Sequence, residues 1–114
     1  MDKLDEQIDF YANLAVKLGM KHSVWSMYEI VDPFVPTDYD VVEKLVYNDH
    51  WGEIGTVEVE LGNFRFYPTW IDLWRAADEA IKLSRDTHHV FIEELKYYPE
   101  EKAVYLCICT LAAK

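Results

Sequence analysis

Residues 57–67 are Val-Glu-Val-Glu-Leu-Gly-Asn-Phe-Arg-Phe-Tyr, and they give the clearest local signal of secondary structure in the sequence. Apolar and polar residues alternate on both sides of Gly62-Asn63, as they do in strands with one buried face. Gly-Asn is typical of a two-residue hairpin turn, so the stretch predicts an antiparallel hairpin. Such a turn fixes the register of the two strands. Leu61 would then lie opposite Phe64, Glu60 opposite Arg65, and Val59 opposite Phe66.

A second hairpin is predicted toward the C-terminal end of the sequence. Residues 89–98 and 103–111 are rich in β-forming residues, and residues 99–102 between them suit a four-residue loop. The run from Val104 to Ile108 is continuously apolar, which is typical of a strand covered on both faces. We therefore expect residues 103–111 to occupy a central position in the sheet.

Three segments have the periodicity or the capping residues of helices. Residues 4–18 place apolar side chains at the spacing of one helical face. Residues 38–47 follow Thr37, which resembles an N-cap and predicts a short helix there. The third helix is expected to follow Thr69, because Asp72 stands three positions later, as in a capping box.

Residues 22–31 supply one more strand, since they are rich in valine, isoleucine and aromatic residues. The predicted element order is then α-β-α-β-β-α-β-β. Strands joined by short loops must pair antiparallel. We therefore expect an α+β fold, with an antiparallel sheet of about five strands and three helices packed mainly on one face, in a single domain spanning residues 1–114.

The charge of the chain narrows the classes of partner. Its 114 residues include 21 acidic and 11 basic ones, for a net charge of −10. Such a protein repels the phosphates of nucleic acids and of anionic lipids. We therefore expect no direct nucleic-acid binding and no membrane binding. The complementary partner is a basic protein surface.

The negative charge is concentrated in the first half of the sequence. Residues 1–60 hold 13 acidic residues against four lysines, and residues 32–60 hold eight against Lys44 alone. If these residues share a surface, they would steer a basic partner toward it. The alternative is that the acidic residues serve solubility only.

Trp51 stands in a polar connection among these carboxylates, where it could be an exposed interface anchor or a plug over the core. Closely spaced carboxylates can also imitate a phosphate backbone, and small inhibitors of nucleic-acid enzymes, many of them phage-encoded, share this composition. We therefore expect an accessory or inhibitor protein that occupies a nucleic-acid-binding surface of another protein. The predicted partner-binding residues are Asp38, Asp40, Glu43, Asp49, Trp51, Glu53, Glu58 and Glu60.

The sequence contains no phosphate-binding glycine loop and no nucleophile elbow, so a binding protein is favoured over an enzyme. His50 with Glu53, or Asp86 with His88, has a spacing that can hold a metal ion. However, His88 and His89 are consecutive and would point to opposite faces of a strand, so at most one of them could join a site. The Cys-x-Cys pair lacks a second pair of cysteines. We predict no catalytic residue, no metal site and no cofactor.

Cys107 and Cys109 stand two apart in the apolar run. An i,i+2 disulfide on a strand strains the bond, because the Cα atoms lie near the workable limit of about 7 Å. Both residues are expected to be reduced, buried thiols, as in a cytoplasmic protein. The polar first residues do not resemble a targeting peptide, and no apolar stretch approaches the roughly 20 residues of a membrane span.

Two alternatives to an acidic docking surface remain open. A small-molecule pocket or a small active site could lie between sheet and helices, lined by His88, His89 and an inward Glu93 or Glu94. Because strand alternation directs one of the two glutamates inward, that carboxylate would have a perturbed pKa, unless it marks an edge strand. A homo-oligomer that pairs an exposed strand edge is the third option.

Overall fold

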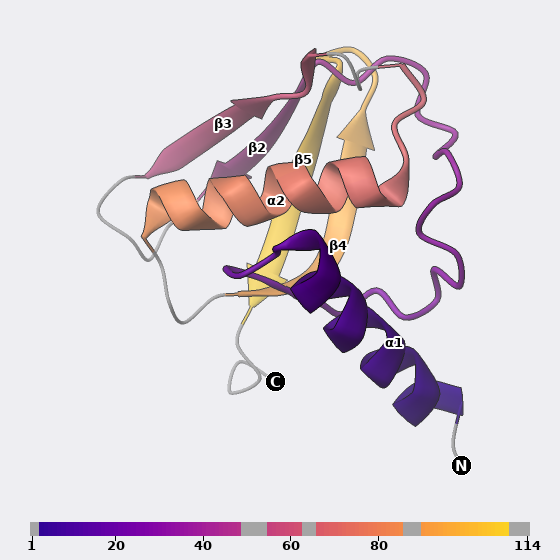
Figure 1. The fold of residues 1–114 in the computed structure, drawn as a ribbon. Helices are drawn as coiled ribbons and strands as arrows, with labels where there is room; N and C mark the ends of the chain where they lie inside the picture. The colour runs from indigo at the N-terminus through magenta and orange to yellow at the C-terminus, as the bar shows by residue number, and fades with distance from the viewer. Residues whose placement is uncertain (1–2, 49–54, 63–65, 86–89, 110–114) are drawn as a thin grey trace.

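A computed structural model of the protein describes residues 3–48, 55–62, 66–85 and 90–109 (Figure 1). The described residues form a five-stranded sheet with two helices. In chain order the elements are α1 (Lys3–Leu18), β1 (Val24–Trp25), β2 (Lys44–Asn48), β3 (Thr56–Glu60), α2 (Trp70–Ser84), β4 (Phe91–Tyr98) and β5 (Ala103–Cys109).

The chain has an α+β fold, but the expectation of an antiparallel sheet with three helices is wrong. The strand order is β1-β4-β5-β2-β3, and the sheet is mixed, because β1 pairs with β4 and β2 pairs with β5 in parallel. The remaining pairs, β2–β3 and β4–β5, are antiparallel. Short loops impose antiparallel pairing only on strands that follow each other in the chain. Each parallel pair joins strands that are distant in sequence and have α2 between them, so no short loop constrains their direction.

The predicted helix at residues 38–47 is replaced by strand β2. Leu45, Val46 and Tyr47 are consecutive and all buried, which suits a strand covered on both faces and not one face of a helix. In a short apolar run, periodicity does not distinguish a strand from a helix. Thr37 is not a helix cap: its N–H donates to the carbonyl of Pro68 (2.8 Å), which ties this connection to the start of α2.

Of the three pairs predicted for the hairpin within residues 57–67, only Val59 with Phe66 lies wholly within the described residues, and this pair is wrong. β3 pairs with β2, so Val59 lies opposite Leu45, and Phe66 forms an isolated bridge with Val41. Phe64 and Arg65 lie outside the described residues. The predicted alternation is confirmed, because Val57 is buried and Glu58 is exposed. Alternation determines which face a side chain occupies, but it does not determine which strand lies alongside.

The second hairpin is confirmed, with Tyr98 opposite Ala103 at its turn. β5 lies third among the five strands, as its apolar run predicted. The strand expected at residues 22–31 is reduced to Val24–Trp25, which pair with the start of β4. The N–H of Ser26 still donates to the carbonyl of Ile92 (3.0 Å), and the chain then continues as the connection to β2.

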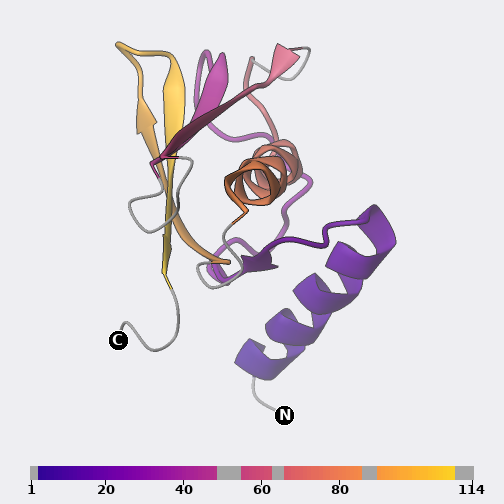
Figure 2. The same ribbon diagram turned by 90° about the vertical axis from the view of Figure 1, so that its left-hand side faces the viewer.

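The helix after Thr69 is confirmed in detail as α2. The Thr69 side chain accepts a hydrogen bond from the N–H of Asp72 (3.1 Å), and the Asp72 carboxylate accepts one from the N–H of Thr69 (3.0 Å). Figure 2 shows α1 and α2 on the same side of the sheet. The opposite face of the sheet is therefore not covered by either helix.

The core lies between the sheet and the helices and is rich in aromatic rings. Trp25 is 1% exposed, and its ring centroid lies 5.8 Å from that of Tyr11 and 5.4 Å from that of Trp74. Asp78 of α2 is buried at the side of this cluster. Its carboxylate accepts hydrogen bonds from the Ser23 hydroxyl (2.6 Å) and the His22 N–H (2.9 Å), so it holds the chain at the start of β1 against α2.

Candidate acidic docking surface

Two of the predicted partner-binding residues meet at one end of the sheet. Glu60 ends β3 and lies opposite Lys44, the first residue of β2. The N–H of Leu61 donates to the carbonyl of Glu43 (3.0 Å), so Glu43 lies beside the same end of β3. Both glutamates are exposed. The antiparallel pairing of β2 and β3 therefore joins carboxylates that are 17 positions apart in the chain.

The turn between β4 and β5 adds carboxylates that sequence reasoning missed. The N–H of Glu43 donates to the carbonyl of Lys102 (2.7 Å), so this turn lies next to the start of β2. Glu100 and Glu101, both exposed, belong to it. Their adjacency was visible in the sequence, but the parallel pairing of β2 with β5 was not.

Asp40 completes the group from the connection that precedes β2. The N–H of Tyr67 donates to the Asp40 carbonyl (3.3 Å), and Val41 bridges Phe66. Hydrogen bonding to the Asp40 carboxylate raises the pKa of the Tyr67 hydroxyl. We use the name acidic end for the five exposed residues Asp40, Glu43, Glu60, Glu100 and Glu101, which gather where β2, β3 and the β4–β5 turn meet (Figure 1, top).

The other predicted residues are distributed as follows. Glu58 is exposed on β3, on the face of the sheet that the helices do not cover, and forms an ion pair with Lys44 (Nζ–Oε2 3.4 Å). Asp38 is exposed next to Tyr39, where burial, followed by the charge of Asp38, raises the tyrosine pKa. Asp49, Trp51 and Glu53 lie outside the described residues.

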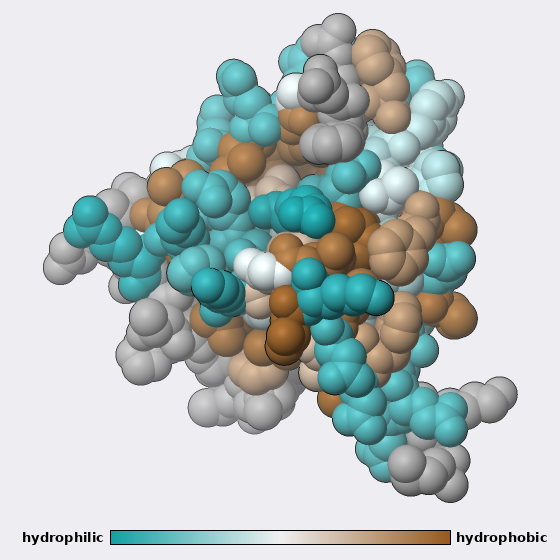
Figure 3. All heavy atoms as spheres, viewed as in Figure 1, coloured by the Kyte–Doolittle hydropathy of each residue, from teal (hydrophilic) through white to brown (hydrophobic). Residues whose placement is uncertain are grey.

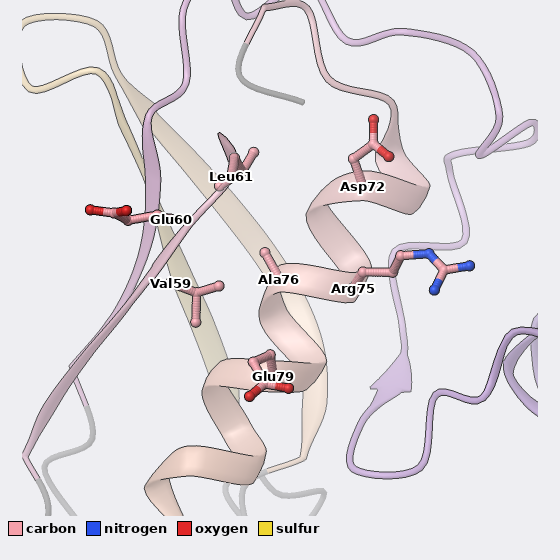
Figure 4. A pocket seen from close by; sticks show the side chains of 7 residues that line it. All are labelled: Val59, Glu60, Leu61, Asp72, Arg75, Ala76 and Glu79. Atoms are coloured by element: carbon pink, nitrogen blue, oxygen red, sulfur yellow. The ribbon is translucent and has the colours of Figure 1, made fainter. Parts of the chain in front are cut away.

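A groove runs between β3 and α2, on the face of the sheet that the helices cover. Its lining residues are Val59, Glu60, Leu61, Asp72, Arg75, Ala76 and Glu79. Figure 4 shows Val59 and Leu61 directed toward α2, with Ala76 facing them and Arg75 directed away from β3. The volume is about 220 Å³. Small-molecule sites usually measure roughly 300–1,000 Å³, so this groove is better suited to a side chain than to a whole ligand.

This groove lies at the opposite edge of the sheet from the pocket expected near Glu93 and Glu94. There the predicted alternation is interrupted, because a register shift between Ile92 and Glu94 inserts an extra residue. Ile92 and Leu95 are both buried, Glu93 is half-buried, and Glu94 is exposed and forms an ion pair with Lys96. The bulge thus removes the reason to expect a glutamate in the core.

The histidines considered as ligands, His50, His88 and His89, lie outside the described residues. Among the residues that the structure does describe, no group of three or more histidine, cysteine or carboxylate side chains could hold a metal ion.

A separate apolar area lies on the long connection between β1 and β2. Val31 is 75% exposed and Phe34 is 56% exposed, with Val35 beside them. Figure 3 shows hydrophobic surface along the right-hand side of the molecule, where this connection runs. It is distinct from the acidic end, which lies at the top of the same view.

Comparison of the chain with protein-family models, with curated proteins and with solved structures found no match. Within the described residues, neither helix combines the length and the apolar character needed to cross a membrane.

Proposed function

We propose that this protein is a non-enzymatic binding protein whose acidic end docks onto a basic surface of another protein. The observation that carries the proposal is that three separate segments with exposed carboxylates lie side by side: the connection before β2, the end of β3 and the β4–β5 turn. The lysines that these segments place at the same end of the sheet are Lys44 and Lys102. Among the described residues of these segments, five carboxylates against two ammonium groups leave a negative local field.

The framework under these carboxylates favours binding over solubility alone. Glu60 is held in register by β2, and the hydrogen bonds from Glu43 and Leu61 link β2 to both of its neighbours. Charges held on a rigid sheet need little reordering when a partner binds, so more of their interaction appears as affinity. Charges that serve only solubility have no such requirement.

The partner is a protein and not a nucleic acid, because the net charge of −10 opposes phosphate binding. The complementary surface carries lysine and arginine, as nucleic-acid-binding surfaces do. Occupying such a surface would block access of the nucleic acid. This is the inhibitory role that the composition of the chain suggested.

The test compares two variants with the same change in charge. The first neutralises three residues of the acidic end by Glu43→Gln, Glu60→Gln and Glu101→Gln. The second neutralises exposed residues of α1, at the far end of the molecule, by Asp5→Asn, Glu6→Gln and Asp9→Asn. Wild type and both variants are immobilised, partners are captured from a lysate of the source cell, and the dissociation constant of each purified partner is measured.

We expect the acidic-end variant to bind the partner roughly tenfold more weakly, because three exposed ion pairs contribute up to about 1 kcal/mol each. The α1 variant should bind like wild type. Affinity should also fall as salt rises from about 0.1 M to about 1 M, where the Debye length falls from about 10 Å to about 3 Å. A partner that binds all three proteins equally, or that is insensitive to salt, would contradict the proposal.

A further inference from the structure

We infer that the free edge of β3, together with the groove between β3 and α2, binds an extended basic segment of the partner as an added antiparallel strand. The inference rests on the proposed function and specifies how the partner binds. It combines three features: an unpaired strand edge, a groove beside it that can take a side chain, and carboxylates on both sides of the edge.

The first feature is the edge itself. β3 is the last strand in the order β1-β4-β5-β2-β3, and no other described strand pairs with its outer side. The N–H of Leu61 points to β2, where it donates to Glu43. Because successive residues of a strand point their N–H and C=O groups to opposite sides, those of Glu60 and Glu58 point to the free edge. They are available to hydrogen-bond an added chain.

The second feature is the groove. Its apolar wall is formed by Val59 of β3, by Leu61 directly after this strand and by Ala76 of α2 (Figure 4). A residue added opposite Val59 would direct its side chain to the same face of the sheet as Val59, and therefore into the groove. Peptides that extend a sheet obtain their specificity from such side-chain pockets, whereas the main-chain hydrogen bonds provide affinity.

The third feature is the charge on the two sides of the edge. Glu58 and Glu60 are exposed on the uncovered face of the sheet, so side chains added opposite them would be lysine or arginine. Asp72 and Glu79 border the groove, while Arg75 points away from β3. The surface therefore fits a segment in which basic residues alternate with aliphatic ones.

A second copy of the same chain fits this edge less well. Antiparallel pairing of β3 with β3 would bring the glutamates of one copy next to those of the other. Like charges directly opposite each other destabilise a sheet. Alternating glutamates on an edge strand are a known means of preventing self-association.

The experiment uses a fluorescent, terminally blocked peptide in which lysine and valine alternate, with anisotropy to measure binding to the full-length chain. Two further peptides carry backbone N-methyl groups. In one the lysines are methylated, and in the other the valines are. In antiparallel pairing the residues opposite Glu58 and Glu60 donate their N–H groups to β3, and these are the lysines. The valine N–H groups point away to solvent.

We expect the lysine-methylated peptide to bind roughly tenfold or more weakly than the unmodified one, and the valine-methylated peptide to bind like it. Equal affinity of the two methylated peptides would overturn the inference, as would no binding of the unmodified peptide at about 1 mM. The reverse order of the two would overturn the antiparallel direction and indicate a parallel added strand.

A charge exchange adds a gain of function that misfolding could not produce. The double variant Glu58→Lys and Glu60→Lys should lose the lysine–valine peptide and bind its glutamate–valine counterpart, which wild type should reject. If the peptides fail but a captured partner still depends on the acidic end, only strand addition is wrong. If the peptides bind as expected but that partner ignores the acidic end, the proposed function is wrong.

Discussion

The two edges of the sheet are built in opposite ways. The β1 edge is two residues long and lies against the aromatic core, with Trp25 1% exposed. The β3 edge is five residues long, and Glu58 and Glu60 on it are exposed to solvent. An edge strand presents unpaired backbone groups that another chain can use. At β1 this hazard is limited by shortness and burial, whereas at β3 it is limited by charge.

Because of this difference, we expect changes at the two edges to affect different properties, namely stability at β1 and partner binding at β3. The β1 edge carries buried rings and a buried hydrogen-bond network, so changes there should alter the free energy of unfolding. The β3 edge carries exposed charges, whose individual contributions to stability are small. Changes there should alter partner binding and leave folding almost unchanged.

The largest effect is expected for Trp25→Ala. The indole packs against Tyr11, Trp70 and Trp74, and its Nε1 donates to the carbonyl of Met27 (3.0 Å). Removing it should lower the free energy of unfolding by about 3–5 kcal/mol, measured by urea denaturation. Val24→Ala, at its 41% exposed neighbour in the same strand, is the control and should cost much less. Similar losses for the two variants would show that the β1 edge is not part of the core.

The next effect is expected for Asp78→Ala. This change leaves the His22 N–H and the Ser23 hydroxyl without their acceptor, and should cost about 1–3 kcal/mol in the same assay. Glu79→Ala, at the adjacent exposed position of α2, should change stability by no more than about 0.5 kcal/mol. If both variants unfold at the same urea concentration, the Asp78 network does not stabilise the β1 edge.

A pH effect of intermediate size is expected at Tyr11. Burial raises the pKa of its hydroxyl to about 12, from 10.0 in the unfolded chain. A raised pKa contributes stability that is fully present below pH 10 and is lost as the pH rises toward 12. By about pH 11 wild type should have lost on the order of 1 kcal/mol more than Tyr11→Phe, because that variant cannot ionise at this position. Parallel pH profiles of the two proteins would refute the assignment.

The smallest effect on stability is expected for the double variant Glu58→Ala and Glu60→Ala. Both side chains are exposed, and the ion pair of Glu58 with Lys44 is a surface pair. The free energy of unfolding should change by no more than about 0.5–1 kcal/mol. If this double variant lowers the free energy of unfolding as much as Asp78→Ala does, the two edges do not differ in their contribution to stability.

Helix α2 and the connection before β2 show when a capping pattern predicts a helix correctly and when it does not. Thr69 and Asp72 form the capping box that their spacing predicted, whereas Thr37 and Asp40, with the same spacing, cap no helix. The two threonines differ in the pattern of apolar residues on their C-terminal side. After Thr69 the apolar residues recur on one helical face, but after Thr37 they form the consecutive run Leu45, Val46 and Tyr47, which a strand buries better.

The candidate site could be predicted only in part. Asp40, Glu43 and Glu60 were identified by charge, and the structure brings them together. Glu100 and Glu101 were missed because their place beside Glu43 depends on β2 pairing with β5. Asp78 of α2 is buried although it is charged, because the chain at His22 and Ser23 packs over that side of the helix.

Helices α1 and α2 and the β4–β5 hairpin could be predicted from local sequence patterns, because caps, helical periodicity and a short turn act between residues close in the chain. Such patterns also predict which side chains of β3 face solvent, because alternation is a property of a single strand. The pairing of β3 with β2 and the parallel direction of two strand pairs are visible only in the three-dimensional structure. Strand pairing depends on which distant strands bury the most apolar surface together. No local sequence pattern reveals that total buried area.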